Sequence, residues 1–204
     1  MMPWVVFWAP LKPTGQIDRT LVVFVSDHGE FLGNHGLLRK PSLHYDETLR
    51  VPLMLRLPDR AAGGRRVNGM VELTDVYPTL LGLLNLPSNP GVQGVDWSSN
   101  IRSGDPIGRD DIFADMFDLK SPFFKLSGPF MAVMTLRTAH WKLNVYPTAG
   151  HEFGQLFNLQ ADPDEAENLY AAPQCRLIRE EMMWRLAQRC HLNADPLPFI
   201  LTQW

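Results

Sequence analysis

An aspartate and a histidine stand side by side at Asp27-His28, directly after the apolar, β-branched run at 20–26. A carboxylate oxygen and an imidazole nitrogen can bind one divalent cation together, and Gly29 lets the backbone turn away without a side chain blocking that cation. In open α/β sheets, ligands gather beyond the carboxyl ends of strands, so the pair is placed for chemistry. Ordinary turn chemistry is the alternative reading of such a pair.

The residues that follow extend this pattern in a fixed order. A Gly-Asn-His-Gly segment contains His35, and Lys40 stands thirteen positions after Asp27. This order resembles the sulfatase family of the alkaline phosphatase superfamily, in which a strand ends in Ser-Asp-His/Asn-Gly, a Gly-x-His-Gly turn follows, and a lysine holds the anionic group of the ester. The resemblance implies that Asp27 and His28 are metal ligands and that Lys40 is a catalytic residue that also binds substrate. For His35 it implies a catalytic role, with a turn or supporting role as the alternative.

These residue types suit the hydrolysis of a sulfate or phosphate ester. The leaving oxygen and the non-bridging oxygens carry negative charge in the transition state, which a cation and the ammonium of Lys40 would stabilise. The resemblance implies a divalent metal cofactor, calcium first and manganese or magnesium as alternatives. We expect the metal site to be incomplete within this chain.

The resemblance covers the chain from about Thr14 to Leu192. It includes a second strand, a helix with Asp-x-x-Pro-Thr-Leu-Leu, and the family's C-terminal signature of Leu-Phe-Asn-Leu, Asp-Pro and Asn-Leu. The segments that carry it after Lys40 are 49–55, 73–84, 91–94, 137–142 and 155–169.

The resemblance and the hydrophobic patterns together predict an α/β protein. We expect part of an alkaline-phosphatase-like mixed sheet with helices at 14–105, and then a small α+β C-terminal subdomain at 106–204, a four-stranded antiparallel sheet plus a helix. The run at 20–26 is apolar throughout, which is typical of a strand buried on both faces. The other expected elements are a strand at 51–57, a helix at 74–84, strands at 111–117, 130–137, 141–146 and 155–159, and a helix at about 173–192 with Ile178, Met182, Leu186 and Cys190 facing the core.

Several polar residues favour structural roles. Asp75 is better explained as a helix cap than as a catalytic group. Asp162-Pro163 with Glu167-Asn168 reads as a turn and a cap. Asp110-Asp111 opens a strand, unlike the paired metal-binding aspartates of the family. The histidines expected to be surface or hydrogen-bonded structural residues are His44, His140, His151 and His191.

The nucleophile of the family is absent from this sequence. A complete sulfatase carries it in Cys/Ser-x-Pro-x-Arg, where the residue is oxidised to formylglycine, and has two further metal-binding aspartates. Neither Cys175 nor Cys190 has a proline two positions on, so neither completes that motif. We therefore expect the C-terminal fragment of a sulfatase-like hydrolase, inactive alone. The alternatives are a phosphonate or phosphate ester hydrolase and a non-catalytic oligomerisation or binding module.

The composition excludes some partners and leaves others. The formal charge is -3, from 19 basic and 22 acidic residues, without a charged block, so we expect no nucleic acid partner. No apolar run reaches the roughly 18 residues of a membrane helix, and the first ten residues make a poor export signal. The expected partners are a sulfate or phosphate ester, as a small molecule or sugar, and either a second copy or a complementing N-terminal part that covers the strand at 20–26.

Overall fold

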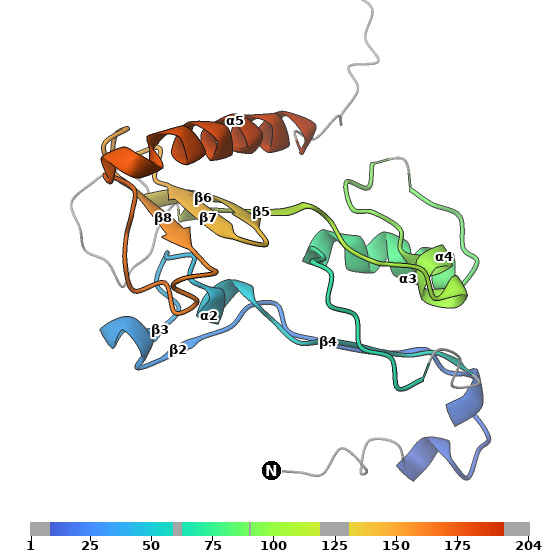
Figure 1. Ribbon diagram of the computed structural model, residues 1–204. Coiled ribbons are helices and arrows are strands. Elements are labelled where there is room, and N and C mark those ends of the chain that lie inside the picture. The colour runs from blue at the N-terminus through green and yellow to red at the C-terminus, as the bar shows by residue number, and fades with distance from the viewer. Residues whose placement is uncertain (1–8, 59–62, 90, 119–130, 194–204) are drawn as a thin grey trace, which may run out of the picture.

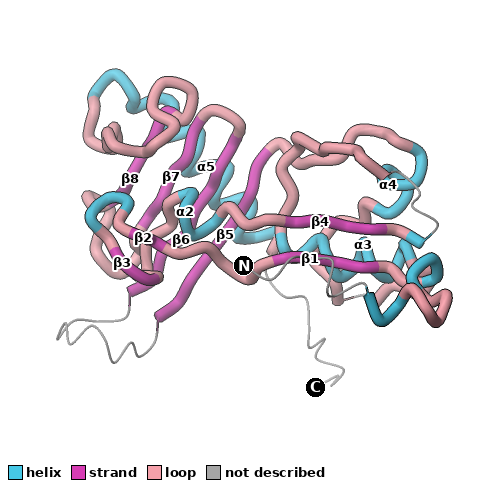
Figure 2. Tube along the Cα trace, turned by 90° about the horizontal axis from the view of Figure 1, so that it is seen from below, coloured by secondary structure: helices cyan, strands magenta, loops and turns pink. Residues whose placement is uncertain are grey.

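The structure is a computed structural model in which residues 9–58, 63–89, 91–118 and 131–193 are described. The largest sheet of the described residues has four strands, with a long helix on one face (Figure 1). Strands β1 and β4 form a separate pair that lies beside shorter helices (Figure 2). The α-helices are α2 (Asp46–Leu49), α3 (Val76–Leu83), α4 (Ser98–Ser103) and α5 (Arg176–Leu192). The short 3-10 helices are η1 (Ala9–Leu11), η2 (Ile17–Arg19), η3 (Asn34–Gly36), η5 (Leu73–Asp75) and η6 (Pro173–Cys175).

Strand β1 (Val22–Val25) pairs antiparallel with β4 (Leu53–Arg56), with Val22 opposite Arg56. Both strands were expected from their apolar runs, but β1 is not buried on both faces. Its first three residues are half-buried and Val25 is exposed, because within the described residues the pair has no further strand beside it. The pair therefore presents open edges.

A short hairpin follows β1. Strand β2 (Phe31–Leu32) pairs with β3 (Leu38–Arg39), and the turn between them contains η3. Phe31 is fully buried against Tyr45, whose ring centroid lies 5.7 Å away. This packing holds the hairpin against the start of α2.

The expected helix at 74–84 is present as η5 and α3. Asp75 stands at the N-cap position of α3, as expected, but its side chain makes no capping bond to that helix. Its carboxylate instead closes a capping box with Glu72 and accepts hydrogen bonds from the Val95 amide at 2.7 Å, the Trp97 indole at 3.2 Å and Arg109 Nε at 3.0 Å. Asp75 is therefore a buried structural hub that joins η5 to the chain after α3.

The four strands of the C-terminal region form one antiparallel sheet in chain order, as the sequence predicted. The register places Leu136, Leu143 and Leu156 side by side on three neighbouring strands. The strands are β5 (Asp111–Asp118), β6 (Met131–Thr138), β7 (Trp141–Val145) and β8 (Gly154–Asn158).

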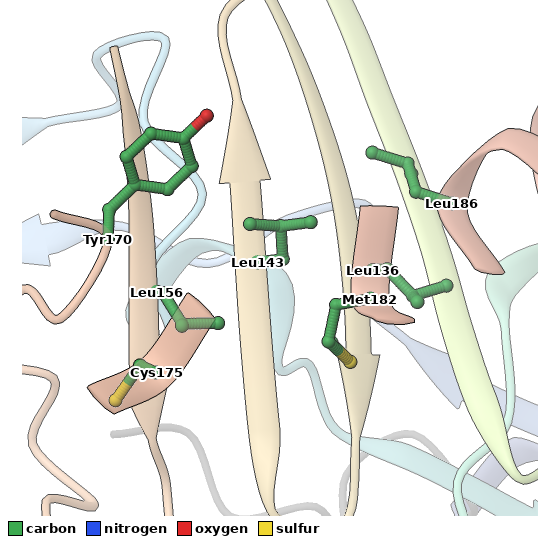
Figure 3. Close-up of a cluster of buried hydrophobic side chains, with 7 residues drawn as sticks. All are labelled: Leu136, Leu143, Leu156, Tyr170, Cys175, Met182 and Leu186. Carbon is green, nitrogen blue, oxygen red and sulfur yellow. The ribbon is translucent and has the colours of Figure 1, made fainter. Parts of the chain in front are cut away.

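Helix α5 covers one face of this sheet (Figure 1). Met182 and Leu186 are buried, and Ile178 and Cys190 pack beside them, which confirms the expected i, i+4 stripe. Figure 3 shows the main hydrophobic core between helix and sheet. Its seven residues are Leu136, Leu143, Leu156, Tyr170, Cys175, Met182 and Leu186.

The opposite face of the same sheet is polar and is also buried. Side chains alternate between the faces of a strand, so the neighbours of the core leucines point away from α5. In register on this face lie Thr135, Asn144 and Gln155, and beside them Arg137, Lys142 and Phe157. The segment at 44–46 covers this face, with Tyr45 and Phe157 ring centroids 5.7 Å apart. The two faces together fasten the sheet to α5 on one side and to α2 on the other.

Candidate active site

Asp27 and His28 follow β1 directly, as the sequence predicted. The next residue, Gly29, donates its amide to the Thr48 carbonyl at 2.9 Å. A side chain at Gly29 would meet the backbone oxygen of Glu47, because a Cβ there would lie only 1.8 Å from it. The end of β1 is therefore pinned against α2, and only glycine permits that close approach.

The β2–β3 hairpin then returns the chain toward the end of β1. Phe31 pairs with Arg39, so the residue after β3, Lys40, comes back beside the residues that precede β2. Asp27, His28 and Lys40 all line one open cavity of about 1190 Å³. The structure thus brings together three of the four site residues expected from the sequence.

The Asp27 and His28 side chains have a geometry that suits a shared cation. Oδ2 of Asp27 and Nε2 of His28 are 3.6 Å apart, which fits two ligands with metal–ligand distances of about 2.0–2.6 Å. Nδ1 of His28 lies 2.7 Å from the Gly29 carbonyl, and a carbonyl only accepts, so Nδ1 carries a proton. In this tautomer Nε2 faces the carboxylate, which is the arrangement that a metal-bound histidine has.

The carboxylate of Asp27 is held in its charged form. The His28 amide donates to Oδ1 at 3.0 Å, and this hydrogen bond is the largest cause that lowers the pKa of Asp27. Its own backbone amide, the charge of His28 and, more weakly, the charge of Lys40 act in the same direction. An ionised, exposed carboxylate at this point suits a cation ligand.

Within the described part of the chain, no group of three or more His, Cys, Asp or Glu side chains is arranged to hold a metal ion. The assignment of Asp27 and His28 as two ligands of an incomplete metal site stays a prediction. A carboxylate and an imidazole are donors that manganese takes readily, whereas calcium prefers oxygen donors.

His35 lies apart from the three cavity residues. It occupies the hairpin turn with a positive φ of 54°, which is uncommon for a residue with a side chain. Its ring stacks on Tyr45 with centroids 4.1 Å apart, and its Nε2 lies 3.5 Å from Glu47 Oε1. These contacts describe a residue that holds the turn against α2. The catalytic role expected for His35 stays a prediction.

A buried charged cluster beside the cavity was missed by sequence reasoning. Nζ of the fully buried Lys142 lies 2.8 Å from Asp46 Oδ1 and 2.6 Å from Glu165 Oε1, and Arg137 forms a two-pronged pair with Asp46. Burial raises the pKa of Glu165. Burial also acts to raise the pKa of Asp46, but Lys142 and Arg137 outweigh it and the pKa is lowered. In the sequence, Arg137 and Lys142 appear only as charged residues within strand patterns. Such residues usually face solvent, so the pattern did not indicate a buried cluster.

The remaining polar residues behave largely as expected. Asp162 accepts hydrogen bonds from the amides of Ala166 at 3.1 Å and Glu167 at 2.8 Å, which confirms a turn. Asp111 pairs with Arg185 and Arg189 of α5, so it is a structural residue. His140, His151 and His191 are exposed, whereas His44 is buried and lines the cavity.

The fold resembles solved hydrolases of the alkaline phosphatase type. A structure described as a complex with its substrate D-glucosamine-2-N,6-O-disulfate superimposes with a TM-score of 0.79 and 21% identity, over 95% of this chain and 38% of that one. The phosphonate monoester hydrolase of Agrobacterium radiobacter gives a TM-score of 0.78 and 25% identity, over 92% of this chain and 38% of that one. None of the helices in the described ranges is long and apolar enough to cross a membrane.

The sequence comparisons define the family. The model of the C-terminal region of N-sulphoglucosamine sulphohydrolase matches residues 33–191, so the chain belongs to the sulfatase family. Arylsulfatase K of Bos taurus is 30% identical over 172 residues, which cover 79% of this chain and 29% of that protein. An ulvan-active sulfatase of Formosa agariphila is 28% identical over 179 residues, covering 86% and 33%. This chain thus spans about a third of the length of these relatives.

Proposed function

We propose that this chain contributes the cation-binding and anion-binding half of a sulfate ester hydrolase. The observation that carries the proposal is the shared cavity of Asp27, His28 and Lys40, with the two expected ligand atoms 3.6 Å apart. Asp27 Oδ2 and His28 Nε2 would hold a divalent cation, which supplies charge stabilisation to the ester when bound. Lys40 binds the non-bridging oxygens as a point charge.

The chain by itself binds the ester without hydrolysing it. Among its 204 residues neither cysteine stands in the Cys-x-Pro-x-Arg context of the family nucleophile. Sulfated sugars are the first substrate class to test, because a structural relative is described with a glucosamine disulfate. A complementing polypeptide with the nucleophile and the remaining metal ligands would complete the site.

Calorimetric binding of phenyl sulfate in the presence of calcium, manganese or magnesium tests this proposal. We expect binding that requires a cation and that Lys40→Ala weakens about tenfold or more, since a charge-assisted contact is lost. Lys12→Ala is the matched control, because Lys12 is an exposed lysine of the N-terminal segment. Equal affinity in wild type and Lys40→Ala would contradict the proposed role of Lys40.

Asp27→Asn separates the cation site from the anion site. The neutral amide is a weaker ligand, so cation affinity should fall while the fold is kept, with the exposed Asp164→Asn as control. Comparing the three cations also decides between calcium, expected from the family, and manganese, which the imidazole of His28 favours.

A phosphate or phosphonate ester is the second candidate substrate. It is favoured by the similarity to the phosphonate monoester hydrolase, which is 25% identical over 92% of this chain. Phenyl phosphate in the same titration separates the two: tighter binding of phosphate than of sulfate, again dependent on Lys40, would favour this candidate. Turnover of either ester that Lys40→Ala abolishes would contradict the expected inactivity and support an enzyme.

We further propose that the β1–β4 pair is covered in solution by a second copy or by a complementing chain. Val25 is 38% exposed and Met54 53% exposed on this two-stranded pair, which also has open edges. Sedimentation velocity should show self-association that Met54→Lys weakens, with the exposed Leu177→Lys of α5 as control. A monomer with low binding of a hydrophobic dye would contradict this.

A further inference from the structure

His44 stands in the chain between Lys40 and α2. It is only 6% exposed, and it lines the same cavity as Asp27, His28 and Lys40. A buried histidine is informative only when both ring nitrogens are assigned, because one donates and the other accepts in the neutral ring. The hydrogen bonds around His44 make that assignment.

The assignment begins at Asn144. Its Nδ2 donates to the His44 carbonyl at 3.2 Å and to Gln155 Oε1 at 3.0 Å. A backbone carbonyl only accepts, so the atom that faces it must be the amide nitrogen. The orientation of the Asn144 amide is therefore decided by the main chain, and its Oδ1 faces Thr135.

The orientation of Asn144 fixes the donor and the acceptor in the hydrogen bonds of Thr135 and His44. Thr135 has one hydroxyl proton, which it donates to Asn144 Oδ1 at 2.7 Å. The contact between Thr135 Oγ1 and His44 Nδ1, at 2.8 Å, then requires the proton of Nδ1. His44 is thus held in the tautomer that carries its proton on Nδ1, and Nε2 has a lone pair.

The second nitrogen is available to a ligand. Across the described ranges, Nε2 of His44 has no hydrogen-bond partner, and it is not one of the fully buried unpaired polar atoms there. It therefore keeps some exposed surface, on a residue that lines the cavity. Burial, followed by the charges of Lys142 and Lys40, lowers the pKa of His44 to about 4, so the ring is neutral at neutral pH.

We propose that Nε2 of His44 accepts a hydrogen bond from a hydroxyl or amine N–H of the alcohol part of the ester. This rests on the proposed function, in which the cation and Lys40 bind the anionic part. Lys40 lines the cavity with a positive charge for the anionic part, and Nε2 of His44 adds a neutral acceptor for a polar hydrogen. That combination selects a hydroxyl-bearing ester, such as a sugar sulfate, over an aryl sulfate.

Two substitutions separate this role from a structural one. His44→Asn keeps an amide N–H at the position of Nδ1, so it preserves the bond to Thr135 and removes the acceptor in the cavity. His44→Gln places an amide oxygen near the position of Nε2 and loses the bond to Thr135. A merely structural His44 would tolerate Asn better than Gln, whereas the proposed role predicts the reverse order for binding.

The experiment is calorimetric binding of glucose 6-sulfate and phenyl sulfate by the 204-residue chain with a divalent cation. We expect His44→Asn to weaken glucose 6-sulfate about threefold to tenfold more than phenyl sulfate, and His44→Gln to restore much of the difference. The exposed His151→Asn is the matched control. An equal loss for both esters in His44→Asn would overturn the role of His44 while Lys40→Ala still tests the anion site. No binding of either ester by wild type would contradict the proposed function and, with it, this role.

Nitrogen NMR of the imidazole gives an independent readout. An unprotonated ring nitrogen resonates far downfield of a protonated one, so the ligand-free chain at neutral pH should show Nδ1 protonated and Nε2 bare. Glucose 6-sulfate should shift the Nε2 signal upfield through the new hydrogen bond. A proton on Nε2 in the ligand-free chain would overturn the proposal regardless of any binding result.

Discussion

Nζ of Lys142 lies 2.8 Å from Oδ1 of Asp46, although 96 positions separate the two residues. The lysine is fully buried, and the same ammonium also contacts Glu165. Because Asp46 begins α2 and Lys142 lies in β7, this contact fastens α2 to the C-terminal sheet. The geometry of the cavity therefore depends on the polar face of that sheet.

Removing the buried cation should be strongly destabilising. In Lys142→Met the buried carboxylate of Glu165 and the half-buried carboxylate of Asp46 would lose that partner, so the free energy of unfolding should fall by about 3–5 kcal/mol in urea denaturation at neutral pH. Arg176→Met, which breaks an exposed pair with Glu180, is the control and should change it by about 0.5 kcal/mol or less. A Lys142→Met chain as stable as wild type would show that the cluster contributes little.

The buried state of His44 predicts a pH dependence of stability. The folded pKa is lowered to about 4 from 6.5, so the unfolded chain takes up a proton at higher pH than the folded one. The contribution of His44 is thus fully present above pH 6.5 and is lost as the pH falls toward about 4, on the order of 3 kcal/mol in total. Urea denaturation at several pH values should show a steeper loss for wild type than for His44→Asn. Parallel curves would mean that His44 does not titrate in this way.

The close approach of Gly29 to α2 predicts a specific sensitivity. Gly29→Ala would place a Cβ 1.8 Å from the Glu47 oxygen, so the backbone must move. We expect a loss of about 1–3 kcal/mol of stability and weaker cation binding at Asp27 and His28, measured by denaturation and calorimetry. Gly15→Ala is the control, since its Cβ meets nothing and only its φ of +66° adds a cost of about 1 kcal/mol. Unchanged cation affinity in Gly29→Ala would show that cation binding does not depend on the close approach of Gly29 to α2.

The hydrogen bonds of Asp75 indicate that the negative charge of its side chain contributes more to stability than the size of the side chain does. Asp75→Asn keeps the size of the side chain but cannot accept both prongs of Arg109 and the surrounding amides together. The free energy of unfolding should fall by about 3 kcal/mol, which thermal denaturation would show as a lower Tm. Asp164→Asn, at an exposed position, should leave Tm nearly unchanged. Similar Tm values for both variants would rule out Asp75 as a main anchor.

The sequence predicted the local elements well. Strands β5 to β8 have apolar runs, and the stripe of α5 follows a helical period, so both could be assigned from near neighbours along the chain. Asp27, His28 and Lys40 were expected together from the resemblance of their motif, and the structure adds the β2–β3 hairpin that brings Lys40 back toward the end of β1. The prediction that β1 is buried on both faces was wrong, because the burial of a strand depends on which elements lie beside it.

By itself, the sequence determined the family, the order of the elements and three residues of the cavity. Only the tertiary structure decided that Lys142 is a buried cation, that His35 stacks on Tyr45 away from the cavity, and that His44 is buried and lines the cavity. The physical reason is that a hydrogen bond or ion pair depends on separation in space. His44 and Thr135 are 91 positions apart in the chain and 2.8 Å apart in the fold, and no local pattern contains that contact.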